Sequence, residues 1–209
     1  MSEDVYAQLT WSDGVDNPFG IRCLDCRPFS QVVLSGALDR SIAARFAELR
    51  NSGGEQHLGI SPGNPVTVSC CLSYPFGGRA EDGTLFAAYE MEDKWDIYLH
   101  RGCLYFARSW TGILVFAAPV TFSSRQAQVL SVVADAEAAS DDPDFIVRQV
   151  DFLIKSHVLG LEVPHPLPAG FPEDIQQIAS YSFARYGRRA SFATFGDTLR
   201  IPIPQAGVQ

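Results

Sequence analysis

The middle of the chain alternates between apolar and polar residues with a period of two, the pattern of strands that bury one face. Five such segments follow one another between Val66 and Val120, and a further one comes after Ser123-Ser124. Short segments separated by turn residues are typical of an antiparallel meander. The expected strands are 66–74, 84–91, 95–100, 103–109, 113–120 and 128–135. We expect the sheet that they form to be the centre of the protein.

Two tight turns set the expected register of this sheet. Each has the two-residue length of a β-hairpin turn and ends in glycine: Arg101-Gly102 and Thr111-Gly112. The first pairs Trp95 with Arg108 and places five apolar side chains on one face: Trp95, Ile97, Leu99, Leu104 and Phe106. The second pairs Phe106 with Ala117 and extends this face onto the third strand, with Arg108 as the one charge on it. The loop 75–83 is expected to join the first two strands as a pair.

Three segments have apolar residues at helical spacing and are bounded by start and stop signals. They begin at about Ala37, after Asp142 and after Pro172, and they end at Arg50, Gly160 and Gly187. The apolar stripe of the first is Leu38, Ile42, Phe46 and Leu49. Asp142-Pro143-Asp144 supplies the second with an N-cap and a first-turn proline. We expect the third helix to dock on the sheet.

The rest of the chain is irregular. Residues 1–35 hold at most two short strands, and one more is expected at 191–195. No repeat or shift of composition divides the chain, and the segment after the proline-rich linker 163–170 is too short for a core of its own. We therefore expect one α+β domain, residues 1–209, in which two or three helices pack on an antiparallel meander of about five to seven strands.

Composition and charge narrow the class of protein. The chain of 209 residues is 46% hydrophobic and 19% charged, which is typical of a folded globular protein. Sixteen basic against twenty-four acidic residues give a net charge of -8, which disfavours nucleic acid and anionic membranes as partners. The first residues lack the basic and apolar regions of a signal peptide, and no run is apolar enough to span a membrane. We therefore expect a cytoplasmic protein.

Cysteines offer the clearest motif, because the phosphate-binding, dinucleotide-binding, zinc-protease and serine-hydrolase signatures are all missing. Cys23 and Cys26 have the spacing that lets two thiolates reach one metal ion, and the first hairpin places His100 beside Cys103. These four residues are an alternative zinc site. A redox pair is disfavoured because Pro28 follows closely and no helical period begins there. We interpret the odd number of cysteines as free thiols and expect no cofactor.

Arg108 is the most informative single residue, because an arginine on an apolar sheet face must find a polar partner or lose solvation. Two interpretations remain open. In the first, the guanidinium stacks on Trp95 or Trp110 while its head reaches the sheet edge or an acid on a covering helix. In the second, Arg108 holds the carboxylate or phosphate of a small ligand in a pocket walled by Trp95 and Trp110.

The opposite face of the same strands carries a polar and aromatic band: Asp96, Tyr98, His100, Tyr105 and Ser109. With Tyr98 and Tyr105 at its centre, this band is predicted to be a surface for interaction with another protein. A sheet face that is merely half-exposed is the alternative.

A binding or protein-interaction domain without catalytic activity fits these features best, since no catalytic constellation accompanies the aromatic sheet faces. One alternative is an enzyme or sensor that binds a small anionic ligand through Arg108, Trp95 and Trp110. Another is a zinc-bearing domain that uses Cys23, Cys26, His100 and Cys103. The sequence leaves the partner, the ligand and the oligomeric state undetermined.

Overall fold

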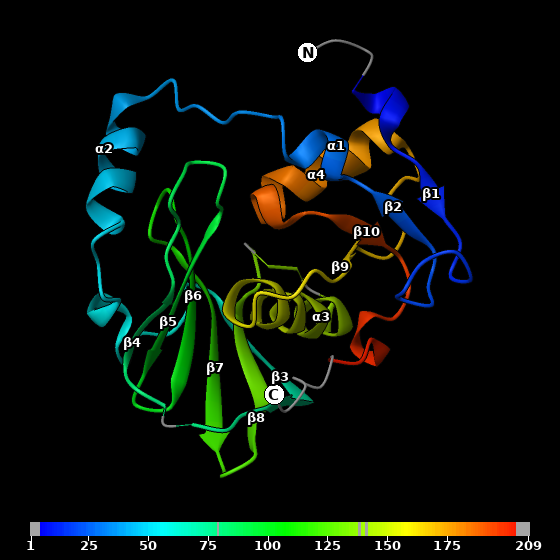
Figure 1. Cartoon of the computed structure of the whole chain (residues 1–209). Coiled ribbons are helices and arrows are strands. Elements are labelled where there is room, and N and C mark those ends of the chain that lie inside the picture. Colours follow the sequence, from blue (N-terminus) through cyan, green and yellow to red (C-terminus); the bar gives the residue numbers. More distant parts are fainter. Residues whose placement is uncertain (1–4, 79, 138, 141, 204–209) are drawn as a thin grey trace.

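The computed structural model describes residues 5–78, 80–137, 139–140 and 142–203. Its centre is a six-stranded antiparallel sheet with the strand order β3-β8-β7-β6-β5-β4 (Figure 1). The strands are β3 (Pro65–Pro75), β4 (Gly83–Phe86), β5 (Trp95–His100), β6 (Cys103–Arg108), β7 (Leu114–Phe122) and β8 (Gln126–Asp135). The expected class, an α+β fold on an antiparallel sheet, is confirmed.

A smaller sheet of four short strands lies beside the first, with the order β1-β2-β10-β9 (Figure 1). Its strands are β1 (Trp11–Ser12), β2 (Cys23–Asp25), β9 (His165–Pro166) and β10 (Phe192–Thr194). β9 and β10 are parallel, whereas the other neighbours are antiparallel. The sequence predicted isolated short strands but not this sheet, because strands of two or three residues carry too little alternation to reveal their partners.

The α-helices of the described chain are α1 (Arg27–Ser30), α2 (Arg40–Leu49), α3 (Pro143–Leu153) and α4 (Ile175–Tyr186). A π-helical turn, Ile154–Val158, continues α3, and 3-10 turns occur at Tyr6–Gln8, Glu55–His57, Gly187–Arg189 and Thr198–Arg200. The Asp142 carboxylate accepts hydrogen bonds from two N–H groups at the start of α3, and the Asp174 carboxylate accepts one from the Gln177 N–H at the start of α4. The predicted start of α3 is confirmed. The last helix was expected to open at Pro172 but begins at Ile175, because Asp174 is the N-cap that satisfies an N–H group without a partner within the helix.

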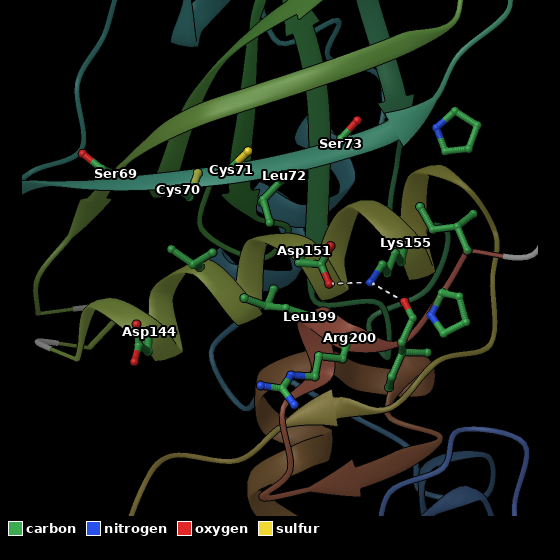
Figure 2. A pocket seen from close by; sticks show the side chains of 15 residues that line it. Ser69, Cys70, Cys71, Leu72, Ser73, Asp144, Asp151, Lys155, Leu199 and Arg200 are labelled. Atoms are coloured by element: carbon green, nitrogen blue, oxygen red, sulfur yellow. Dashed lines mark hydrogen bonds and ion pairs between the residues drawn. The ribbon is translucent and has the colours of Figure 1, made fainter.

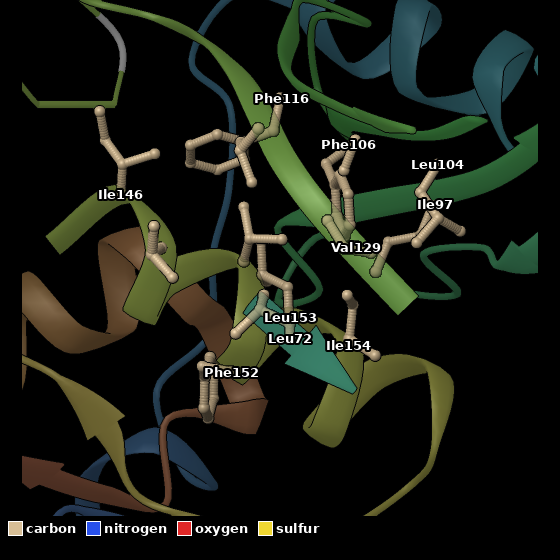
Figure 3. Packing of buried hydrophobic residues seen from close by; sticks show 14 of the residues in the cluster. Leu72, Ile97, Leu104, Phe106, Phe116, Val129, Ile146, Phe152, Leu153 and Ile154 are labelled. Atoms are coloured by element: carbon tan, nitrogen blue, oxygen red, sulfur yellow. The ribbon is translucent and has the colours of Figure 1, made fainter. Parts of the chain in front are cut away.

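The main core lies between one face of the six-stranded sheet and α3 (Figure 3). The apolar side of this helix is buried against the sheet through Ile146, Val150 and Leu153, and Ile154 of the π-helical turn continues it. On the sheet side they meet Phe106, Phe116 and Val129, each fully buried. Removal of this apolar surface from water is the main stabilising contribution to the fold.

The register predicted for the first hairpin is confirmed, whereas the register predicted for the second is not. Trp95 pairs with Arg108 as expected, and the turn between β5 and β6 has positive φ at both central residues, as a tight hairpin turn requires. In the second hairpin Phe106 pairs with Phe116, not with Ala117, and the register shifts beyond that pair. The Arg108 N–H donates to the Ile113 carbonyl, so the turn is longer than two residues. The predicted register of this hairpin is therefore wrong by one residue at Phe106 and by two at Ala107.

The place of β3 also differs from the prediction. It pairs with β8, with Val68 opposite Val132, and so lies at the opposite edge of the sheet from β4. The loop between β3 and β4 therefore crosses from one edge of the sheet to the other. The sequence shows which two strands a loop connects but not whether those strands pair with each other, because pairing depends on the other strands of the sheet.

Two predicted elements are shorter in the structure. The strand expected at 84–91 ends at Phe86, because the chain turns away after it and the Ala88 N–H donates to the buried Asp96 carboxylate. The first helix begins at Arg40. Leu38, expected in its apolar stripe, precedes the helix and is fully exposed.

The last helix does not pack mainly on the six-stranded sheet, as was expected. Ile178 and Phe183 of α4 belong to a second hydrophobic cluster, together with Leu24 of β2 and Phe29 of α1. Tyr186, at the end of the helix, reaches the main core. The smaller sheet provides the surface on which α4 packs. The sequence did not predict this packing because it does not reveal how the short strands of that sheet pair.

Candidate functional site

Arg108 ends β6 and reaches the last turn of α4. Its guanidinium lies over the Trp95 ring, with 4.8 Å from Cζ to the ring centroid. Nη1 donates to the Arg185 carbonyl and Nη2 to the Ala184 carbonyl, each at 2.9 Å. Carbonyls at a helix C-terminus lack partners within the helix and carry the negative end of its dipole. The stacking proposed for Arg108 is therefore present, with backbone carbonyls in the place of an acidic side chain.

The two tryptophans flanking Arg108 have different positions. Trp95 is fully buried, stacks on Phe116 at 5.7 Å and donates its indole N–H to the Arg185 carbonyl at 2.7 Å. It belongs to the core beneath Arg108. Trp110 follows β6 in the turn and donates to the Met91 carbonyl at 2.8 Å. Trp110 lines a cavity next to Arg108, whereas Trp95 is absent from its lining.

Lys94 is the residue that sequence analysis missed. Its side chain is buried, with the residue 6% exposed, and Nζ donates to Ser35 Oγ at 2.7 Å and to the Met91 carbonyl at 2.6 Å. The ammonium also lies 4.3 Å from the centroid of the Trp110 ring and 5.1 Å from that of Phe183. A lysine directly before a predicted strand gave no signal of burial.

Burial is the main cause of the lowered pKa values of Lys94 and Arg108. Burial and, less strongly, the positive charge of Arg108 lower the pKa of Lys94 to about 8, against the opposing effect of two nearby carboxylates. Burial and the charge of Arg185 lower the pKa of Arg108 to about 10. Both groups therefore carry a charge at neutral pH while poorly solvated, and an anion nearby would stabilise both.

These side chains border one cavity of about 530 Å³, within the size range of small-ligand pockets. Its described lining is Ser35, Lys94, Arg108, Trp110, Thr111, Ile113, Phe183 and Ala184. The lining includes two cations and no acid, and most of the others are apolar or aromatic. We refer to it as the Lys94 cavity.

The face that carries Tyr98 and Tyr105 is covered. The two residues are 1% and 6% exposed, since the irregular segment 52–60 lies over them. The His57 ring is 5.6 Å from that of Tyr98, and the Gly59 N–H donates to the Tyr105 hydroxyl at 3.1 Å. A partner could touch these tyrosines only after displacing segment 52–60, which had no periodic pattern from which its position could be predicted.

The four candidate zinc ligands do not come together. Cys23 lies on β2 and Cys26 caps α1, both beside the smaller sheet, whereas His100 and Cys103 flank the hairpin turn of the larger one. Nε2 of His100 is 2.8 Å from the Gly53 carbonyl and donates to it. Among the described residues no group of three or more His, Cys, Asp or Glu side chains could hold a metal ion. The alternative of a zinc site at Cys23, Cys26, His100 and Cys103 is therefore not supported by the described structure.

A short helix does begin directly after Cys26, contrary to the expectation from Pro28, which is instead accommodated in its first turn. Both cysteines are nonetheless buried. Burial raises the pKa of Cys23 to about 11 and that of Cys26 to about 12. Since the thiolate is the reactive form, these two cysteines are inert core residues at neutral pH.

Thiol reactivity should follow burial. We expect Cys71, which is exposed on β3, to react first with iodoacetamide in the native protein, and Cys23 and Cys26 to react last. A time course of alkylation, read by mass spectrometry of peptides, measures this order. Protein in urea is the control, in which all five should react at similar rates. Early labelling of Cys23 or Cys26 in the native protein would contradict their burial.

A second hollow of about 530 Å³ lies between β3, α3 and residues 199–203 (Figure 2). The buried Lys155 ammonium lies 2.8 Å from Asp151 Oδ2 and donates to the Ile201 carbonyl at 3.1 Å. The Tyr74 hydroxyl donates to the other Asp151 oxygen at 2.9 Å. These contacts bind the charged groups to one another and to the C-terminal segment, so we assign them a structural role.

None of the described helices is long and apolar enough to cross a membrane. Comparison of the chain with protein-family models, curated proteins and solved structures finds no match in any of the three. The functional conclusion therefore depends on the chemistry of the Lys94 cavity.

Proposed function

We propose that the protein is a binding domain, without catalytic activity, for a small organic anion held in the Lys94 cavity. The observation that carries this proposal is a buried lysine and a partly buried arginine on one cavity that no described acid lines. Two poorly solvated charges of the same sign favour a ligand of the opposite sign.

Hydrogen-bond donors remain for such a ligand. A lysine has three N–H donors and an arginine five. Lys94 uses two of them on Ser35 Oγ and the Met91 carbonyl, and Arg108 uses two on the end of α4. Charge-assisted hydrogen bonds from the remaining donors would bind a carboxylate, sulfonate or phosphate.

The apolar part of the lining favours an organic anion over an inorganic one. Trp110, Ile113 and Phe183 supply most of the remaining wall, and their surface would be buried by an apolar or aromatic body. The ligand that fits this cavity best is a carboxylate or similar anion attached to such a body.

We favour binding over catalysis because Lys94, whose pKa is about 8, is mostly protonated at neutral pH and donates to Ser35 Oγ and the Met91 carbonyl, so its amine is not free to attack a substrate. The hydroxyls of the cavity, which belong to Ser35 and Thr111, also lack a base, because no described histidine or carboxylate lines it. An interaction role for Tyr98 and Tyr105 would require segment 52–60 to move, so we place the binding function in the Lys94 cavity.

The test uses anilinonaphthalene sulfonate, an aromatic anion whose fluorescence rises on binding, displaced by benzoate or by uncharged benzyl alcohol. We expect benzoate to compete much better than benzyl alcohol. Lys94→Met and Arg108→Met should each weaken benzoate binding by about tenfold or more, the effect of losing one charge-assisted hydrogen bond. Because Lys94 loses its proton near pH 8, affinity should fall as the pH rises through that value.

The control is Arg125→Met, which removes one positive charge at an exposed position outside the cavity. It should leave benzoate binding unchanged. Circular dichroism would verify that each variant is folded, since Arg108 also holds the end of α4. Equal competition by benzoate and benzyl alcohol, or full affinity in folded Lys94→Met, would refute the proposal.

A further inference from the structure

A separate cavity of about 180 Å³ opens at the end of the six-stranded sheet. Leu99, Leu104, Val120 and Val129 line it from the sheet, and Ile154 and Val158 line it from the π-helical turn after α3. Figure 3 shows Ile154 on the helix side of the core and Leu104 and Val129 on the sheet side. We refer to it as the apolar cavity.

The topology of the sheet explains why a cavity exists here. Because β3 and β4 occupy opposite edges, the loop between them passes the ends of the intervening strands, and Phe76, Ala80 and Glu81 of this loop form part of the lining. On the other side, the helix widens into a π turn at Ile154–Val158. Such turns are rare and occur frequently at functional sites. The loop and the π turn together enclose space that the sheet and α3 do not fill.

The mouth of the apolar cavity is itself apolar. Leu85, Phe122 and Leu159 line it, and each is 37% exposed. The rings of Phe76 and Phe122 lie 4.8 Å apart, so an aromatic pair borders the entrance. Exposed hydrophobic side chains that gather around a hollow, as opposed to being scattered singly, mark a site for an apolar partner.

Polar chemistry at this cavity is sparse. The Tyr74 hydroxyl is directed to Asp151, which leaves Glu81 as the one charged side chain of the described lining. Among the residues that the structure describes, no lysine, arginine or histidine lines the cavity, in contrast to the Lys94 cavity. The described lining therefore offers an anionic ligand no positive charge, and a polar ligand would lose hydrogen bonds to water without replacement.

We propose that the apolar cavity binds a small uncharged molecule, an aromatic ring or a short alkyl chain. An engineered apolar cavity of about 150 Å³ in another protein stays dry and takes up benzene, so the size and lining found here are sufficient for a ligand of that class. This inference is independent of the proposed function, since the two cavities share no residue.

The test is a titration of the full chain with toluene, followed through the NMR signals of the methyl groups. We expect saturable shifts at Leu99, Leu104, Val120 and Val129 and an increase in melting temperature. Ala127→Trp, which places a ring at a lining position, should reduce toluene affinity at least tenfold. The matched control Leu130→Trp, on the same strand but exposed and outside the lining, should bind as the wild type does.

Additional variants and ligands test the proposal further. Ala80→Trp fills the mouth from the loop, so it replaces Ala127→Trp if that variant does not fold. Lys94→Met should bind toluene normally, which separates this cavity from the anion site. Absence of saturable methyl shifts in the wild type overturns the proposal, as does undiminished binding by folded Ala127→Trp and Ala80→Trp. Hexan-1-ol should also bind, and tighter binding of hexanoate than of hexan-1-ol would likewise overturn it.

Discussion

Replacement of Lys155 by methionine is expected to lower the free energy of unfolding by about 3–5 kcal/mol, the cost of breaking a buried ion pair by removing one partner. Lys155 and Asp151 each have a side chain that is 5% exposed, and the ammonium and carboxylate lie 2.8 Å apart. Without the ammonium, the Asp151 charge would keep only the Tyr74 hydroxyl. The Ile201 carbonyl would also lose the hydrogen bond from Lys155 that Figure 2 shows as a dashed line, so residues 199–203 would be held less firmly. Urea denaturation measures the change.

The matched control is Arg45→Met, which breaks an exposed ion pair with Glu48. It should cost about 1 kcal/mol or less, because solvent screens such pairs. Removal of both buried charges, in Asp151→Leu with Lys155→Met, should restore part of the stability that Lys155→Met loses. The stability that Lys155→Met loses should also become smaller as the pH falls. At low pH the folded variant binds a proton at Asp151, and the protonated side chain no longer places a charge in the interior. A loss no larger than that of Arg45→Met would show that this pair contributes little.

Gly187→Ala is expected to destabilise the protein by about 2–5 kcal/mol, the sum of the strain of a positive-φ backbone that favours glycine and of local overpacking. Gly187 follows α4 with φ +66°, and a Cβ atom there would overlap the Glu92 carbonyl. The Arg188 N–H donates to the same carbonyl, so the backbones are held together and cannot separate freely. Thermal and urea unfolding would report the loss, and the nearby Lys94 cavity should bind benzoate less tightly.

Gly160→Ala separates the two contributions to this effect. Gly160 has almost the same φ, +67°, but a Cβ atom there would meet nothing within 4 Å. This control should therefore cost only the backbone strain, about 1–2 kcal/mol. Equal losses of stability in the two variants would show that the Glu92 carbonyl does not restrict position 187 to glycine.

Local sequence signals predicted the elements whose causes are local. The β5–β6 register follows from the Arg101-Gly102 turn, because two residues with positive φ fix how the strands meet. Asp142 marks the start of α3, since an N-cap acts on the N–H groups two or three residues ahead. The antiparallel α+β class follows from the same short-range patterns.

The candidate site was predictable only in part. Arg108 could be identified, because one charge on an apolar strand face is a conflict visible in the sequence. Lys94 could not, because its burial depends on Ser35, which lies 59 positions away, and on the arrival of α4 with Phe183. The sequence likewise could not show that segment 52–60 covers Tyr98 and Tyr105, since an irregular segment has no periodicity to indicate which surface it contacts.

Turns, caps and the period of a strand or helix act over a few residues, so the linear order of residues is enough to specify them. The pairing of β3 with β8, the assembly of the smaller sheet and the two cavities arise from contacts between segments far apart in the chain. Such contacts depend on how all elements pack together to exclude water. No short stretch of residues contains that information, and it becomes available only in the folded arrangement.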